Sequence, residues 1–132
     1  MELINLTPHT ITILHPSVYH YDKLSHKYLI NDSCVNTYLH NSLQIKPTGK
    51  LASVHMQTNT TYQQVNGSYV TISNTYPVDV TKLDPNKNYL VSYQYVMACQ
   101  QLGIDTSNLY TVAAKVSLHH CVTVGTIGLI AN

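Results

Sequence analysis

The chain has 132 residues, of which 44% are hydrophobic and only 10% are charged, with a formal net charge of +1. This length and hydrophobic content exclude a disordered chain and predict a single domain over residues 1–132. Every basic residue is a Lys, and the small net charge gives no electrostatic signature of a protein that binds duplex nucleic acid, which usually needs a basic patch. So few charges let copies of the chain approach one another, which favours a homo-oligomer.

Membrane insertion and export are not expected. No run of apolar residues reaches the length of about 18 that a spanning helix needs. The start MELINLTPHT carries an acid at position 2 and lacks the basic residues of a secretion signal. Three cysteines, an odd number, predict reduced thiols in a cytoplasmic protein. We expect Cys34, Cys99 and Cys121 to be small buried hydrophobes.

The first strand is expected within Leu3–Leu14. Ile11 and Ile13 alternate with threonines, which is the period of a half-buried strand. Pro8 cannot donate a ladder hydrogen bond, so it indicates an edge, a bend or a bulge. The next segment, residues 19–42, is polar, aromatic and poorly periodic, and we interpret it as an insertion or long excursion.

The clearest local signal is a β-hairpin. Asn66-Gly67 separates two β-prone runs, and a type I′ turn needs positive φ at both central residues, which these two residue types tolerate. The sequence therefore predicts that Tyr62–Val65 pairs with Ser68–Ile72. The following segment, Thr75–Lys82, contains a proline and is expected as a separate, short edge strand.

One short helix is expected after the hairpin. Ser92 has the side chain of an N-cap, and Gly103 stands where a helix commonly ends, so the helix is predicted over Tyr93–Leu102. Leu109–Val116 and Cys121–Ile130 are predicted to form a final strand pair. Two glycines in the second of these runs indicate bulges or close backbone approach.

These elements predict a mainly β (α+β) protein. The expected architecture is a small β-sandwich or open barrel of about seven to nine short strands with one short helix. An α+β roll is the alternative arrangement of the same elements.

Eight histidines raise the question of a metal site. The densest group is His119-His120-Cys121, but neighbouring strand residues point to opposite faces, so only His119 and Cys121 share one. No HExxH or CxxC spacing is present, and we expect no metal and no cofactor. The alternative role for the histidines is as surface residues in place of Lys and Arg. No nucleophile elbow or phosphate-binding loop occurs, so no catalytic residue is assigned.

Polar and aromatic side chains suggest binding more than catalysis. Eleven Tyr residues, with no Phe or Trp, suit stacking on bases and hydrogen bonding to polar ligands, or else they fill the core and the sheet rims. Asn5, Thr7 and His9 alternate onto one side if their segment is an extended strand. They form either a wall of a binding site or a solvated edge around Pro8. In a further alternative, Asn5 and Thr7 only satisfy backbone groups around Pro8.

The opening INLTPHTITI resembles the start of a family of small proteins of tailed bacteriophages, which begin with NLTPH followed by a β-strand. Further along, Asn88–Ser92 is similar to the family's YIVS strand end, and Asp105 falls near an acidic loop after the helix. Cys121 lies near the family's GC step, with His120 in place of the glycine. The family's usual Arg residues are absent, and residues 19–42 resemble an insertion.

This resemblance implies a phage protein that acts in the cytoplasm of an infected host cell. Small phage accessory proteins often counter host defences, and one class sequesters the nucleotide signals that defence systems make. The function expected on this basis is an oligomeric, non-catalytic sponge for a small nucleotide-type immune signal. An inhibitor that binds a host defence protein directly is the first alternative, and a small phosphodiesterase or other hydrolase is the second.

The expected ligand site combines four groups of side chains. The polar residues of the first strand form one wall, and the start of the helix lies near it because ligand sites favour strand ends. A carboxylate after the helix accepts hydrogen bonds from a ribose or a base, and lysines balance the phosphate because no Arg is present. The residues expected in this site are Asn5, Thr7, His9, Ser92, Tyr93, Asp105, Lys50 and Lys115.

Overall fold

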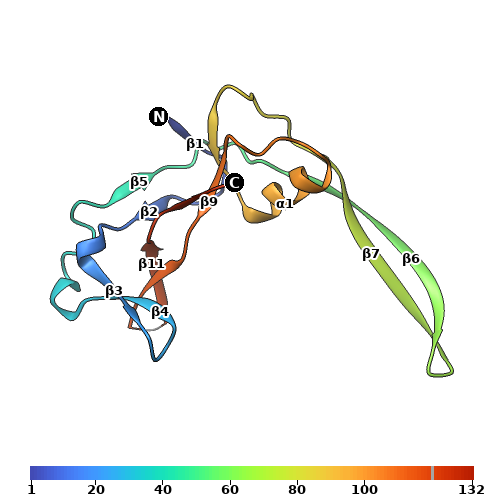
Figure 1. Cartoon of the computed structure of the whole chain (residues 1–132), viewed down its shortest axis with the longest axis horizontal. Coiled ribbons are helices and arrows are strands. Elements are labelled where there is room, and N and C mark those ends of the chain that lie inside the picture. The colour runs from blue at the N-terminus through green and yellow to red at the C-terminus, as the bar shows by residue number, and fades with distance from the viewer. Residues whose placement is uncertain (120) are drawn as a thin grey trace.

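The computed structural model describes residues 1–119 and 121–132. It is mainly β, with 47% of residues in strands and 11% helical, which confirms the predicted fold class. The described residues form two sheets, one α-helix and a two-stranded ribbon that projects from the sheets (Figure 1). Their twelve strands outnumber the expectation, because strands of three or four residues are too short to show a legible alternation.

The first sheet contains a β-α-β unit. β8 (Asn88–Leu90) and β9 (Leu109–Val112) run parallel and adjacent, joined through α1 (Tyr93–Gln101). β1 (Leu3–Asn5) lies parallel on the other side of β8, and β12 (Leu129–Ala131) lies antiparallel beside β9. A helix fits between β8 and β9 because parallel neighbours need a long crossover connection.

The helix forms where its capping residues predicted it. The Ser92 hydroxyl accepts a hydrogen bond from Tyr95 N at 3.2 Å, so it is the N-cap. Gly103 follows the last turn with a φ of 72°, a conformation that costs glycine little. α1 is nine residues long, and no helix in the described part of the chain is long and apolar enough to cross a membrane.

The second sheet draws six strands from both halves of the chain. In sheet order they are β3 (Tyr19–Asp22), β4 (Lys27–Ile30), β10 (Lys115–Leu118), β11 (Val122–Thr126), β2 (Ile11–Ile13) and β5 (Leu43–Ile45). β4 lies parallel beside β10, so the segment 19–42 supplies one edge of this sheet. Short 3-10 helices, Pro16–Val18 and Asp32–Cys34, precede β3 and follow β4.

The predicted C-terminal strand pair forms, but it is divided between the two sheets. β10 pairs with β11 in the six-stranded sheet, while β9 pairs with β12 in the four-stranded sheet. The expectation of one continuous pair, Leu109–Val116 with Cys121–Ile130, is therefore wrong in that respect. The division falls at residues 113–114, between β9 and β10, and at residues 127–128, between β11 and β12, where the chain passes from one sheet to the other.

The third unit, which we call the arm, is the hairpin of β6 (Val54–Val65) and β7 (Ser68–Val80). The predicted turn is confirmed, since Asn66 and Gly67 have φ values of 51° and 82° and Val65 pairs with Ser68. The arm is longer than expected, because the segment after residue 74 continues β7 instead of forming a separate strand. It extends away from both sheets (Figure 1).

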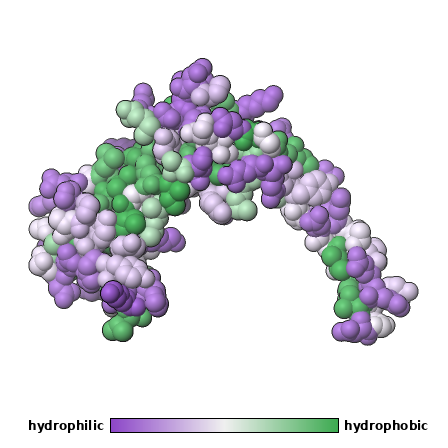
Figure 2. All heavy atoms as spheres, in the orientation of Figure 1, coloured by the Kyte–Doolittle hydropathy of each residue, from purple (hydrophilic) through white to green (hydrophobic). Residues whose placement is uncertain are grey.

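Two hydrophobic clusters hold the sheets together. One packs α1 against the four-stranded sheet and includes Val96 and Leu109. The other lies against the six-stranded sheet around Leu14 and Val116. Figure 2 shows hydrophobic side chains gathered over the body of the molecule, whereas the arm is mostly polar with apolar patches on its outer half. The core thus belongs to the sheets, and the arm contributes to it only at its base through residues such as Val80.

The three cysteines differ in their environments. Cys99 is buried in the core, as predicted, but Cys34 is half-buried and Cys121 is exposed. All are free thiols. The expectation of a buried cysteine is therefore wrong at Cys121, which lies in a turn directly before β11 and not at an inward-facing strand position.

Buried polar side chains secure the places where the chain passes between sheets. After β1, β9 and β11 the chain leaves one sheet for the other. Thr126, which is 4% exposed, places its hydroxyl 3.0 Å from the Ala113 carbonyl oxygen and 2.9 Å from that of Ala114. Where the chain leaves a sheet in the interior, its backbone N–H and C=O groups lose their strand partners and need others. A buried polar group without a partner lowers the stability of the fold.

The close approach of β2 and β11 requires a glycine at position 125. A Cβ placed there would lie 2.9 Å from both the Thr12 carbonyl oxygen and Leu14 Cγ. We expect Gly125→Ala to lower the free energy of unfolding in urea by about 1–3 kcal/mol, because the backbone must shift to relieve the overlap. Gly128→Ala is the matched control, since its Cβ would meet nothing within 4 Å. Equal losses in the two variants would contradict this account.

Candidate ligand-binding site

Two pockets share the segment that follows the arm. Residues 81–83 line both pockets, whose volumes are about 400 and 390 Å³. Small-molecule sites commonly have volumes of roughly 300–1,000 Å³. We name them by their charged side chains: the acidic pocket includes Asp79 and Asp105, and the lysine pocket includes Lys50 and Lys87.

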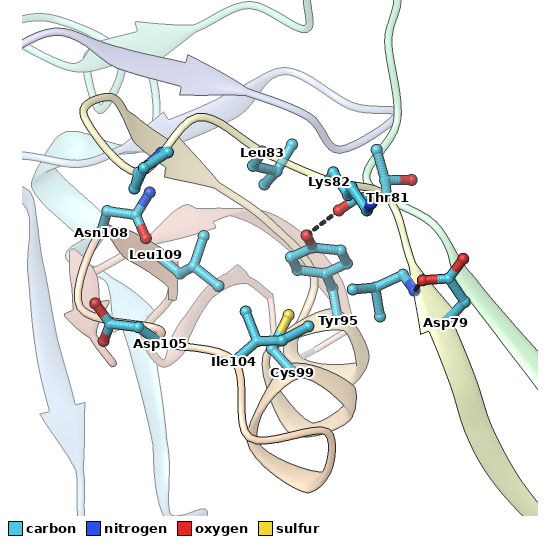
Figure 3. A pocket seen from close by; sticks show the side chains of 12 residues that line it. Asp79, Thr81, Lys82, Leu83, Tyr95, Cys99, Ile104, Asp105, Asn108 and Leu109 are labelled. Atoms are coloured by element: carbon cyan, nitrogen blue, oxygen red, sulfur yellow. Dashed lines mark hydrogen bonds between the residues drawn. The ribbon is translucent and has the colours of Figure 1, made fainter.

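The acidic pocket lies between residues 81–83 and α1 (Figure 3). The Tyr95 hydroxyl donates a hydrogen bond to the Thr81 carbonyl oxygen and so ties the helix to this segment. Burial, with a smaller contribution from the neighbouring Cys99, raises the pKa of the Tyr95 hydroxyl. Burial also raises the pKa of the Cys99 thiol. Both groups therefore remain neutral at physiological pH and form an uncharged wall.

Carboxylates stand at two sides of the acidic pocket. Asp105 accepts hydrogen bonds from the Ser107 hydroxyl at 2.8 Å and from Ser107 N at 3.1 Å, and these bonds lower the pKa of its carboxyl group. Asp79 accepts a hydrogen bond from Val80 N at 2.9 Å. Lys82 lines this pocket as well, but the two carboxylates outnumber it, so the pocket suits an anionic ligand less well than one lined by lysines alone.

The lysine pocket has the opposite character. Its floor is apolar and includes Leu6, directly after β1, and Tyr89 of β8, which are both buried in the cluster that contains the α1 side chains. Lys50, Lys82 and Lys87 are exposed around it, and no acidic side chain is among the described residues that line it. Three positive point charges over an apolar floor match a ligand that has both a phosphate and a flat hydrophobic part.

Local hydrogen bonds hold the backbone that carries these lysines. The Thr48 N–H and hydroxyl both donate to the Asn5 carbonyl oxygen at 3.1 Å, which fixes the loop before Lys50 against the end of β1. The Asn108 side chain donates to the Lys87 carbonyl oxygen at 2.8 Å. The remaining lysine, Lys82, follows directly on Thr81, whose carbonyl is held by α1.

Asn5 satisfies backbone groups around Pro8, which was the alternative to its role in a ligand site. Its side chain is 1% exposed and donates to the carbonyl oxygens of His9 and Ile45, at 2.8 and 2.9 Å. Its side-chain oxygen accepts from Thr7 N at 2.9 Å and from the Thr7 hydroxyl at 2.6 Å. These bonds occupy both N–H groups and both acceptor positions of the carboxamide. No hydrogen-bonding capacity remains for a ligand.

The extended course on which Asn5, Thr7 and His9 would share one side is wrong beyond Asn5, whereas the bend expected as one possibility at Pro8 is confirmed. β1 ends at Asn5, and Thr7–His9 forms a bend. His9 is exposed and contributes its carbonyl oxygen, rather than its imidazole, to the Asn5 network. Pro8 ends the strand because it cannot donate to a ladder, and the Asn5 side chain then stabilises the bend.

The other residues expected in the site lie apart. Ser92 caps α1, and Tyr93 is exposed at the start of that helix. Lys115 belongs to β10 in the six-stranded sheet and lines neither pocket. Asp105 lines the acidic pocket and Lys50 the lysine pocket. The structure therefore brings Asn5 and Thr7 together, but it does not join them to the helix residues in one wall.

Two lysines of the pocket were not anticipated. Lys82 precedes, and Lys87 closes, a turn in which Lys87 N donates to the Asp84 carbonyl oxygen at 3.3 Å and Asn86 N donates to the Asp84 carboxylate at 2.9 Å. A turn brings its two ends close together. In the sequence, the lysines before and at the end of the Asp-Pro-Asn turn therefore indicated a local basic pair. The signal for joining Lys50 to them lies in the parallel pairing of β1 with β8, which the sequence does not display.

The histidines do not converge on a metal site within the described residues. No group of three or more His, Cys, Asp or Glu side chains there has the arrangement to hold a metal ion. In the group singled out from the sequence, His119 adopts a φ of 52° in the turn between β10 and β11. His120 lies outside the described residues. The described part of this turn gives no support to metal chemistry.

No protein-family model, no curated protein and no solved structure matches this chain. The fold and the lysine pocket are therefore the features of the protein that bear on its function.

The Asn5 network generates a stability prediction. We expect Asn5→Ala to lower the free energy of unfolding in urea by about 2–4 kcal/mol, because it leaves buried carbonyl and N–H groups without partners. His9→Ala is the control and should change stability by no more than about 0.5 kcal/mol, since only its backbone takes part. If the two variants were destabilised equally, the Asn5 carboxamide would not be the group that stabilises the contact between β1, the bend at residues 7–9 and β5.

Tyr95 generates a pH prediction. A pKa raised in the folded state means that the unfolded chain ionises first, so stability falls as the pH rises above the unfolded value of about 10. Tyr95→Phe should cost about 1 kcal/mol at neutral pH through the lost bond to Thr81. It should also flatten the alkaline decline, measured by urea unfolding at several pH values. The exposed Tyr62→Phe should do neither, and an unchanged decline in Tyr95→Phe would contradict the assignment.

Proposed function

We propose that this protein binds a small, anionic, nucleotide-type ligand in the lysine pocket and releases it unchanged. The observation that carries the proposal is the convergence of Lys50, Lys82 and Lys87 on one pocket with no acidic residue among its described lining. These are three of the seven lysines of a chain whose charged residues make up only 10%. In so charge-poor a protein, three like charges around one apolar floor are the feature that most favours an anion.

The chemistry of the pocket favours a nucleotide over a bare phosphate. The floor offers Leu6, Leu83 and the ring of Tyr89, which suit a base or another flat apolar group. Lysine ammonium groups supply charge without the bidentate geometry of Arg. Binding therefore rests on electrostatic attraction at exposed side chains, and it should weaken as salt rises.

The proposal includes the biological setting that the NLTPH resemblance implies. In that setting the protein is a phage accessory protein in the cytoplasm of an infected cell, where it sequesters a nucleotide immune signal as a sponge. Support for the sponge over the hydrolase comes from the separation of charges. Asp79 and Asp105 line the acidic pocket, and the described residues that line the lysine pocket include no carboxylate to act as a general base.

The test is to incubate the protein with a panel of cyclic nucleotides and ADP-ribose derivatives, denature it and identify what is released. Intact release supports the sponge, whereas an altered product indicates a hydrolase and no uptake indicates a protein partner. For a compound that binds, we expect replacement of the three pocket lysines by Gln to weaken binding by roughly 100-fold, from about 1 kcal/mol for each charged contact. Isothermal titration at low and high salt measures this loss.

The matched control replaces three lysines that lie outside the pocket, Lys23, Lys46 and Lys115, by Gln. Both triple variants lose the same charge, so a general effect of net charge would weaken binding equally in the two. Equal weakening would contradict the lysine pocket as the site, even if the protein does bind a nucleotide.

A further inference from the structure

The arm carries no charge over most of its length. Between His55 and Asp79 the sequence contains no Lys, Arg, Asp or Glu. Nearly every described side chain of β6 and the outer half of β7 is exposed. At about 3.4 Å per residue, the part from Gln57 to Val65 extends roughly 30 Å. This is a long, neutral, solvent-exposed ribbon on a small protein.

A two-stranded ribbon in water has low stability and two unpaired edges. An isolated hairpin is at best marginally stable, and each of its strands has one edge of unpaired N–H and C=O groups. Proteins commonly protect such edges with lysines, prolines or bulges. In the arm, Pro77 and the register shift beside Met56 lie near the base. The outer part, which is where pairing with another chain would occur, has none of these protections.

The two faces of the arm also suit association. One face carries Tyr62 and Tyr69, which are 77% and 79% exposed, next to hydroxyl pairs such as Thr60 with Ser73 at 3.1 Å. The other face carries the exposed Val70 and Ile72. Apolar patches are visible on the outer half of the arm (Figure 2). Aromatic and β-branched side chains of this kind stabilise neighbouring strands when a sheet is extended.

We propose that the arm pairs with the arm of a second copy of this chain, β6 against β6 in antiparallel orientation, and forms a four-stranded sheet. A two-fold axis places the same edge on both sides, so each free N–H of one copy meets an equivalent C=O of the other. Neither arm has a charge to repel the other, and the whole chain has a net charge of only +1. β6 is favoured over β7 because it can pair along its whole length, whereas Pro77 limits pairing along β7 to the outer part.

Light scattering after gel filtration, at 10–100 µM protein, tests this proposal. We expect the wild-type chain to have twice its 14.8 kDa mass. Two lysines on the outer part of β6, in the variant Asn59→Lys with Gln63→Lys, should give the monomer mass, because they place like charges at the paired edge. A second variant shortens the arm by deleting residues 58–63 and 70–75, which keeps the turn and the strand register. It should also be monomeric.

The matched control is Ser33→Lys with Asn36→Lys, which adds the same charge to exposed residues far along the chain from the arm. It should remain dimeric. A wild-type chain that stays at 14.8 kDa, or an arm variant that stays dimeric, would overturn the proposal. If the lysine variant fails to fold, as judged by urea unfolding, the shortened arm decides the outcome. Nucleotide binding does not enter this measurement, so the result is independent of the function proposed above.

Discussion

The buried carboxamide of Asn5 is the interaction on which the arrangement of the two sheets depends. It lies at the end of β1 and bonds to the bend at residues 7–9 and to the carbonyl oxygen of Ile45 in β5. It therefore joins the four-stranded sheet to the six-stranded sheet through one side chain. Its own carbonyl oxygen accepts two hydrogen bonds from Thr48, so the loop that carries Lys50 is positioned by the same residue.

The segment of residues 81–83 connects the other parts of the molecule. It continues from the arm, lines both pockets and is tied to α1 by the hydrogen bond between Tyr95 and Thr81. The position of Lys82 in the lysine pocket thus depends on the helix on one side and on the arm on the other. A dimer formed through the arm would place two lysine pockets in one assembly, each on its own body.

The candidate site shows where reasoning from sequence alone fails. Lys50 was expected to balance a phosphate and does line the lysine pocket. Asn5 and Thr7 bond to each other and to the backbone, which was the alternative to the ligand-facing role proposed for them. A polar side chain near a proline has the same appearance in sequence whether it meets a ligand or a buried carbonyl group. The difference arises from β5, which lies some 40 residues away and supplies the Ile45 carbonyl.

By itself, the sequence determined the local elements. Asn66-Gly67 specified the hairpin turn, and Ser92 and Gly103 specified the ends of the helix, because each acts through the backbone within a few residues. It also determined the low charge and the mainly β class. Only the tertiary structure decided that the C-terminal strands divide between two sheets and that three lysines meet in one pocket. Those outcomes depend on pairing between strands distant in the chain, such as β1 with β8, which no local pattern records.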